Sequence, residues 1–367
     1  MKTALVIGAG GSLANALHFR GERMRSTLPP LDTTFFEVVR ARKIALSAPL
    51  RTYFQTVLGV DATTAALADR RMEQVFADVF YDFTERTVGG ALDAYIDLVD
   101  LYLRVLRETT NWLCGDSRRG APIGSLLAAT ADLSDDVSVI TFNHDLVIEN
   151  EIHRRARLRP RWCLDQGYGT LSGDLGLLIP TDKVPVFNVH SDGRCSHASP
   201  ITLLKLHGSL NWNVRINSAR PTANLLSGAI QRDLQLVNRR QLPTQREFYA
   251  RRSTGRGRTR WMLWPVVVPP VYAKQALRGA IQKVWTDARS SLEQAERLVI
   301  FGYSLPAIDI EAEKMFERAL ARNTRLRWID VINPAPAAAA RWAGVGGRKA
   351  LRWFPSVDAF IDAGGFE

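Results

Sequence analysis

The chain has 367 residues, of which 46% are hydrophobic, so it can bury a large core in one large domain or two ordinary ones. This composition excludes a largely disordered protein. The formal net charge of +11 comes from 40 arginines and only 8 lysines. Arginine forks around phosphate oxygens, so the excess is consistent with a phosphate-containing ligand, although a genome rich in G and C would produce it as well.

The cysteines and the N-terminal residues indicate in which cellular compartment the protein is expected. Cys114, Cys163 and Cys195 form no C-x-x-C pair, which argues against a disulfide framework and a zinc ribbon. The chain enters an apolar run of about five residues directly after Met1–Thr3, and that run is shorter than the apolar region of a signal peptide. No apolar stretch approaches the ~20 residues that a membrane helix needs. We expect a cytoplasmic protein with no membrane association and no bound metal.

The first predicted element is a strand followed by a helix. Ala4–Ile7 is a short apolar run that meets glycines at once, as a buried parallel strand does before a tight turn. A helix is expected from about Ser12, whose hydroxyl could cap its first turn. Residues 31–130 then place apolar side chains at i, i+3 and i+4, which predicts a helical insertion.

Strand character returns in several apolar runs that end at a polar residue or glycine, the pattern of strands covered on both faces by helices. These runs are 137–141, 184–189, 201–206, 266–268, 297–301 and 328–332. Helices are expected between the later strands, at 273–295 and 310–321. The predicted fold class is α/β, with a Rossmann-like, mainly parallel sheet and a large helical insertion.

We expect a single domain over residues 1–367. Its core would comprise residues 1–30, 131–215 and 262–367, interrupted by the helical insertion at 31–130 and an arginine-rich insertion at 216–261. Within the second insertion, Arg251–Arg260 combines arginines with two glycines and is expected to form a mobile surface loop. Contact with nucleic acid is one interpretation of this loop, and simple solvation is the other.

The glycine-rich turn after the first strand is the first candidate site. Gly8, Gly10 and Gly11 would let the backbone approach a pyrophosphate, with the following helix directing its amide dipoles at the negative charge. A tight turn with no ligand is the alternative. The dehydrogenase fingerprint G-x-G-x-x-G is not completed, because position 13 is Leu, so hydride transfer is disfavoured.

Five motifs in order carry a resemblance to the sirtuin family. They are Gly8-Ala9-Gly10-Gly11-Ser12, Thr141-Phe142-Asn143-His144-Asp145, His207-Gly208, Phe301-Gly302-Tyr303-Ser304-Leu305-Pro306 and Val331-Ile332-Asn333. The set is most similar to the bacterial sirtuin-like proteins of anti-phage defence, whose members hydrolyse NAD. The resemblance implies a sirtuin-like NAD-binding fold with NAD as substrate.

The resemblance also implies a role for each matching residue. Asn143 would hold the nicotinamide ribose and help to position the attacking water, Asp145 would bind the nicotinamide carboxamide, and His207 would be the general base. The remaining residues of the NAD-binding set are Gly8, Ala9, Gly10, Gly11, Ser12, Thr141, Gly302, Ser304 and Asn333.

Each catalytic candidate has a simpler interpretation. Asn143 and Asp145 could cap a helix that starts at about Asp145, and His207 could be a turn histidine with its hydrogen bonds satisfied. His144 is assigned a structural role, because no motif claims it.

Departures from the sirtuin pattern separate the possible activities. No cysteine follows Cys195, so the four-cysteine zinc module of protein deacylases is absent. Asn143 and His207 are 64 positions apart, which is wider than in a typical deacylase. An acyl-lysine groove is therefore disfavoured.

The resemblance implies an NAD glycohydrolase that releases nicotinamide and ADP-ribose, as the effector of an abortive-infection system. Such an activity would be restrained by assembly into a homo-oligomer or by a protein partner, such as a HerA-type ATPase or a nucleotide-sensing subunit. The alternatives are a non-catalytic module that senses NAD or ADP-ribose, and an NAD-dependent protein deacylase.

Overall fold

The computed structural model describes residues 1–20, 28–60, 70–115, 120–162, 167–169, 176–178, 200–216, 234–237, 262–267, 280–307 and 309–365. The predicted strand at 184–189 and the predicted arginine-rich loop Arg251–Arg260 lie outside these ranges.

The main sheet has six strands in the order β10-β9-β8-β1-β2-β4, and every neighbouring pair is parallel. Its strands are β1 (Lys2–Ile7), β2 (Asp136–Thr141), β4 (Ile201–Lys205), β8 (Arg297–Phe301), β9 (Trp328–Ile332) and β10 (Ala350–Phe354). β8 is buried along its whole length, as expected of a strand covered by helices on both faces. The predicted α/β class with a mainly parallel sheet is confirmed.

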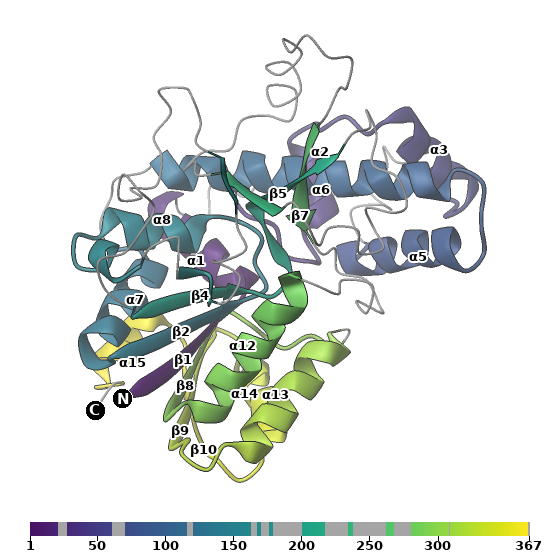
Figure 1. Ribbon diagram of the computed structural model, residues 1–367. Coiled ribbons are helices and arrows are strands. Elements are labelled where there is room, and N and C mark those ends of the chain that lie inside the picture. Colours follow the sequence, from purple (N-terminus) through teal and green to yellow (C-terminus); the bar gives the residue numbers. More distant parts are fainter. Residues whose placement is uncertain are drawn as a thin grey trace.

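Helices cover both faces of this sheet (Figure 1). One layer contains α12 (Ala280–Gln294), α13 (Ile310–Arg322) and α14 (Pro336–Gly346). The other contains α1 (Ala9–Arg20), α7 (Pro122–Leu133), α8 (Val147–Arg154) and α15 (Val357–Asp362). A short 3-10 helix, Arg159–Arg161, follows α8.

The residues between α1 and α7 form the predicted helical region. Its helices are α2 (Phe35–Ala41), α3 (Ala48–Thr56), α5 (Met72–Thr84) and α6 (Ala91–Gly115). α6 is the longest of them and packs against α3, α5 and α8, so it connects this region to the layer on the sheet (Figure 1). The division of the chain into core segments and insertions stays a prediction, and α7, which contacts β2, belongs by its packing to the sheet layer.

A second sheet has the order β3-β6-β5-β7. Its strands are β3 (Gly176–Leu178), β5 (Gly208–Ile216), β6 (Leu234–Val237) and β7 (Met262–Val267). β5 pairs antiparallel with both β6 and β7. The predicted strand at 266–268 is described as far as residue 267, which belongs to β7 in this second sheet. An apolar run indicates burial but does not specify which strand it pairs with.

The first helix also begins earlier than expected. α1 starts at Ala9 and not near Ser12, so the turn after β1 is a single residue, Gly8. Gly10 and Gly11 lie in the first helical turn, and Ser12 is not its N-cap. The glycines do not delay the helix. Their missing side chains let its first turn pack closely on the strand before it, since a Cβ on Gly11 would lie 2.8 Å from Ile7 Cγ2 in β1.

Three elements near the C-terminus were not predicted from the sequence, namely α14, β10 and α15. β10 is an edge strand in which Trp353 is exposed and Arg352 partly buried, so it has no continuous apolar run. α15 is short and begins at the N-cap Ser356, whose Oγ accepts a hydrogen bond from Ala359 N. Among the helices that the structure describes, none is both long and apolar enough to cross a membrane.

A buried ion cluster ties β8, β9 and β10 together. The Asp330 carboxylate is fully buried and lies 2.9 Å from Arg297 Nη2 and 2.7 Å from Arg352 Nε. Arg297 is itself only 2% exposed. Removing the carboxylate would leave a buried guanidinium without its counter-charge, which is costly in a low-dielectric interior.

We therefore expect Asp330→Ala to lower the free energy of unfolding by about 3–5 kcal/mol in urea denaturation. The control is Glu293→Ala, which breaks the largely exposed ion pair with Arg322 and should cost at most about 1 kcal/mol. Equal losses in the two variants would contradict a structural role for the cluster.

Candidate active site at the carboxyl edge of the sheet

The candidate site lies where β1 and β8 sit side by side at the carboxyl edge of the parallel sheet. From β1 the chain proceeds to β2 and β4 on one side, and later to β8, β9 and β10 on the other. The strand order therefore reverses between β1 and β8. Connections diverge at such a switch point and leave a crevice outside the strand ends, where ligands bind in open α/β sheets. A cavity of about 660 Å³ opens here.

Gly8, Gly10 and Gly302 make direct backbone contact where the turn after β1 meets the turn after β8. Gly10 N donates a hydrogen bond to Gly302 O at 3.0 Å. A Cβ atom on Gly8 would lie 2.5 Å from Gly302 O, and one on Gly302, whose φ is +63°, would overlap Gly11 N. Glycine is required here by the close approach of two turns, whether or not a ligand binds. Pyrophosphate binding is not needed to explain these glycines.

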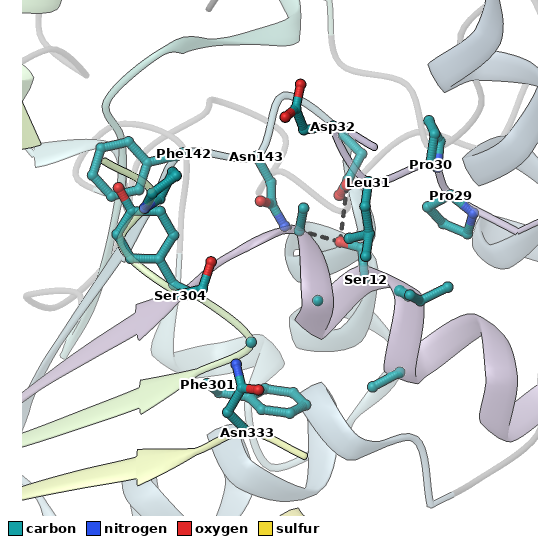
Figure 2. A pocket seen from close by; sticks show the side chains of 18 of the residues that line it. Ser12, Pro29, Pro30, Leu31, Asp32, Phe142, Asn143, Phe301, Ser304 and Asn333 are labelled. Carbon is teal, nitrogen blue, oxygen red and sulfur yellow. Dashed lines mark hydrogen bonds between the residues drawn. The ribbon is translucent and has the colours of Figure 1, made fainter. Parts of the chain in front are cut away.

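The Asn143 side chain, just beyond β2, is held against the first strand and helix. Its Nδ2 donates to Gly8 O and to Ser12 Oγ, each at 3.0 Å. The contact with Ser12 is visible in Figure 2. Because Gly8 O can only accept a hydrogen bond, the amide must be oriented with its nitrogen toward Gly8 and Ser12. Asn143 Oδ1 accepts no hydrogen bond from the residues that the structure describes, and the side chain lines the cavity. A ligand hydroxyl or water can therefore donate to this oxygen.

Asp145 joins the same cluster and also caps the next helix. Ser12 Oγ donates to Asp145 Oδ2 at 2.9 Å, and Val147 N donates to Oδ1 at 3.0 Å. Val147 is the first residue of α8, which begins two positions later than expected. The capping interpretation thus holds for Asp145, whereas Asn143 makes no capping bond.

His207 follows β4 and is 6% exposed. A hydrogen bond of 2.8 Å from Leu206 N to Thr141 O continues the pairing of β4 with β2 past the strand end. The imidazole ring lies 5.0 Å from the Phe142 ring, 6.0 Å from the His144 ring and 6.3 Å from the Trp285 ring, measured between centroids. His207 is therefore fixed within an aromatic wall of the cavity.

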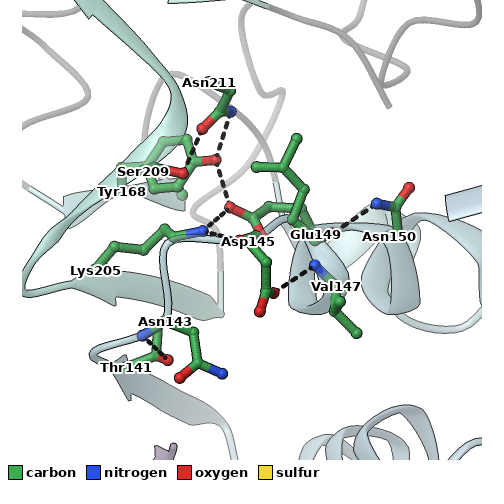
Figure 3. A network of polar contacts seen from close by, with 12 residues as sticks. Thr141, Asn143, Asp145, Val147, Glu149, Asn150, Tyr168, Lys205, Ser209 and Asn211 are labelled. Carbon is green, nitrogen blue, oxygen red and sulfur yellow. Dashed lines mark hydrogen bonds and ion pairs between the residues drawn. The ribbon is translucent and has the colours of Figure 1, made fainter. Parts of the chain in front are cut away.

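A buried polar network supports the loop that carries Asn143 and Asp145 (Figure 3). Lys205 is fully buried and lies 2.8 Å from Glu149, which is also fully buried. Lys205 Nζ donates to the backbone carbonyl of Asp145 as well. Tyr168 donates to Glu149 and accepts from Asn211 Nδ2. Burial, reinforced by the neighbouring Glu149 charge, raises the pKa of Tyr168, so this phenol keeps the proton that it donates.

The cavity brings together most of the residues that the sequence motifs single out. Its lining includes Ala9, Gly10, Ser12, Asn143, Asp145, His207, Gly302, Ser304 and Asn333. Gly8, Gly11 and Thr141 do not line it, and Thr141 Oγ1 instead donates to Ile7 O at 2.6 Å. The Asn333 side chain accepts a hydrogen bond from Ala335 N, so its amide oxygen already serves the turn that leads into α14.

Other cavity residues lie within the sequence motifs but were not predicted to be site residues. The Tyr303 ring stacks on Phe142 with centroids 4.5 Å apart, and its hydroxyl donates to Asp309 Oδ2 at 3.0 Å. His144, assigned a structural role above, also lines the cavity. Its position between Asn143 and Asp145 was the one signal that could have found it.

The helical region supplies a further wall of the cavity. This wall includes Asp32, Arg71, Met72, Glu73, Tyr102 and Leu106. Asp32 holds the start of α5, because its Oδ1 accepts from Glu73 N at 2.8 Å and its carboxylate pairs with Arg71. Nothing in the sequence of this region marks these residues as part of a site.

The arrangement places an amide oxygen, a carboxylate and an imidazole around one cavity. A carboxylate stabilises positive charge that develops on a bound ligand, and an imidazole can accept a proton from water near neutral pH. These groups suit hydrolysis through a cationic transition state. Within the described part of the chain, no cluster of three or more His, Cys, Asp or Glu side chains could hold a metal ion.

Comparisons with known proteins include a distant structural likeness. No protein-family model matches the sequence, and no curated protein matches it either. The crystal structure of Sir2 in complex with the inhibitor EX-527, 2'-O-acetyl-ADP-ribose and a deacetylated p53 peptide is similar to this chain. The match covers 100% of this chain and 95% of that chain, with a TM-score of 0.42 and 10% sequence identity. A likeness this distant carries no argument about ligand or reaction.

The glycine crossing predicts that Gly302→Ala destabilises the protein. The positive φ alone should cost on the order of 1–3 kcal/mol, and overlap with Gly11 N adds to that loss. Gly344→Ala is the matched control, because a Cβ there meets nothing within 4 Å and alanine favours the helix. Thermal denaturation of both variants measures the difference. A Gly302→Ala protein as stable as wild type would rule out the steric explanation.

The buried ion pair predicts that Lys205→Met lowers the free energy of unfolding by about 3–5 kcal/mol, because it leaves the Glu149 carboxylate buried without its cation. The double variant Lys205→Met with Glu149→Leu should recover most of the loss, since no uncompensated charge remains. Urea denaturation of the single and double variants provides the test. Additive losses would show that the two residues do not act as a pair.

Proposed function

We propose that this protein is an NAD glycohydrolase with a sirtuin-like NAD-binding fold. The observation that carries the proposal is the convergence of Asn143, Asp145 and His207 on one cavity at the switch point of the sheet. The sequence motifs that resemble the sirtuin family are the ones whose residues meet there.

The proposed reaction breaks the bond between the nicotinamide nitrogen and C1' of the attached ribose. The electron pair of this bond goes to the nicotinamide nitrogen and neutralises the pyridinium. Water adds to C1' and transfers a proton to His207, so the products are nicotinamide and ADP-ribose. The transition state resembles an oxocarbenium ion, which a nearby carboxylate such as Asp145 stabilises.

Asn143 suits a positioning task in this reaction. Its nitrogen is held by Gly8 O and Ser12 Oγ, which leaves Oδ1 to accept a hydrogen bond from a ribose hydroxyl or from the attacking water. Asp145 retains lone pairs for the nicotinamide carboxamide, because Oδ2 accepts from Ser12 Oγ and Oδ1 from Val147 N, which leaves acceptor capacity on both oxygens.

The rest of NAD would extend along the strand ends. The N-terminus of α1, with Ala9, Gly10 and Ser12, is the proposed pyrophosphate site, because the positive end of the helix dipole favours a phosphate. Gly302 and Ser304 would contact a phosphate or ribose, and Asn333 the adenine ribose. The side-chain oxygen of Asn333 already accepts a hydrogen bond from Ala335 N, so other polar groups of Asn333 would contact the ribose.

The sequence resemblance supports a role as the effector of an anti-phage abortive-infection system. Unrestrained NAD cleavage would kill the cell, so we propose control by a protein partner or by self-assembly. The partner would be an ATPase of the HerA type or a nucleotide-sensing subunit. The Arg251–Arg260 segment is the proposed nucleic-acid contact.

A non-catalytic NAD or ADP-ribose sensor is the second candidate function. The observation that favours it is that Asn143 and Asp145 already have structural roles. Asn143 donates a hydrogen bond to Gly8 O, and Asp145 accepts one from Val147 N at the start of α8. A binding module would retain both residues for these reasons without any turnover.

The proposal predicts nicotinamide release from NAD by the purified protein, alone or with extract from phage-infected cells. His207→Ala should lower the rate by about 10²–10⁴-fold, the usual contribution of a general base, and Asn143→Ala should lower it strongly as well. His18→Ala is the control, since His18 is exposed on α1 and does not line the cavity. Nicotinamide is quantified by chromatography.

Three outcomes separate the candidate functions. Binding of NAD without turnover under every condition would favour the sensor. Turnover that requires an acyl-lysine peptide would favour a deacylase. Release that survives both His207→Ala and Asn143→Ala would exclude this site as the catalytic centre.

A further inference from the structure

One hydrogen bond connects the helical region to the middle of the proposed catalytic loop. Tyr102 Oη, on α6, lies 2.8 Å from His144 Nδ1. Both side chains are buried, at 7% and 4% exposure, and both line the cavity. His144 stands between Asn143 and Asp145 in the chain, so the bond reaches the backbone that carries both residues.

The tyrosine is held firmly by the packing of the helical region. Its ring centroid lies 5.8 Å from that of Phe35 on α2 and 5.8 Å from that of Phe76 on α5. Three helices therefore set the position of the hydroxyl. Burial raises the pKa of Tyr102, and the negative charges of Asp145 and Glu73 raise it further, so the phenol keeps its proton and can donate it.

The histidine in turn contacts the proposed general base. The His144 and His207 rings lie 6.0 Å apart, tilted by 30°, in a stacked arrangement. The His144 backbone is fixed from the same side, because Leu210 N, three residues after His207, donates to His144 O at 2.9 Å. A shift of His144 would therefore displace both the loop of Asn143 and the turn of His207.

We infer that Tyr102 and His144 are positioning residues through which the helical region controls the rate of the proposed cleavage. The inference rests on the proposed function and adds its regulation. With Tyr102 donating to Nδ1, neutral His144 carries its proton on Nε2, and its ring keeps one orientation against His207. A partner that moves α6 would break this bond and slow the chemical step without closing the NAD site.

The first test compares Tyr102→Phe with Tyr95→Phe in the full chain. Tyr95 lies on the same helix and is buried among Phe76, Phe80 and Phe83, and it does not line the cavity. Tyr102→Phe should lower kcat for nicotinamide release about tenfold, which corresponds to the loss of one hydrogen bond, with KM for NAD nearly unchanged. Tyr95→Phe should leave kcat unchanged.

Variants of His144 test the other end of the bond. His144→Asn places an amide oxygen near the position of Nδ1 and should retain more activity than His144→Phe, which keeps an aromatic ring but has no acceptor. Equal activity of these two variants, or a wild-type kcat in Tyr102→Phe, would overturn the inference.

A second measurement is independent of turnover. Imidazole ¹⁵N resonances of histidine-labelled protein, assigned by His144→Asn and His207→Ala, report the tautomer of each ring. We expect Nε2 protonation of neutral His144, and a change in the His207 resonances in Tyr102→Phe that Tyr95→Phe does not produce. Unchanged His207 resonances would overturn the coupling. If the wild type releases no nicotinamide but this change occurs, the glycohydrolase proposal fails while the link between α6 and His207 stands.

Discussion

The close approach of two backbone turns, at Gly8–Gly10 and at Gly302, is the constraint on which the site depends. β1 and β8 are neighbours in the sheet, and the chain departs from them in opposite directions. Their turns can cross only if no side chain separates them, because added Cβ atoms would overlap backbone atoms of the opposite turn. The crossing sets where α1 begins, and thereby where Ser12 stands. Ser12 in turn accepts from Asn143 and donates to Asp145.

Charge burial provides the second support for the site. Lys205 and Glu149 lie in the interior at a considerable desolvation cost, which their mutual attraction and the bonds from Tyr168 and to Asp145 O offset. Two hydrophobic residues of similar volume would pack at lower cost. The ion pair also fixes positions, because the Lys205 ammonium group binds both the backbone carbonyl of Asp145 in the loop and the carboxylate of Glu149 on α8. The loop with Asn143 and Asp145 is therefore rigid before any ligand arrives, a condition for preorganised electrostatic stabilisation.

The helical region is part of the cavity and not merely an addition to the sheet. Tyr102 reaches His144, while Asp32, Arg71 and Glu73 form a wall facing the strand ends. Displacement of α6 would change the cavity as well as the outer surface. A platform for a regulatory partner and a wall of the cavity are thus compatible roles for the same helices, and the aromatic packing of Phe35, Phe76 and Tyr102 connects them.

The sequence by itself determined the central strands and the residues that terminate them. β1, β2, β4, β8 and β9 were predictable because strands buried on both faces are nearly continuous apolar runs, and their ends carry Asn143, Asp145 and His207. The edge strand β10 lacked that pattern, and residues 266 and 267 belong to a different sheet because hydrophobicity does not encode pairing. Only the tertiary structure decided that the glycines meet each other, that Ser12 joins Asn143 to Asp145, and that Tyr102 and Lys205 support the site. These interactions join residues far apart in the chain, and they depend on distances that no local sequence pattern contains.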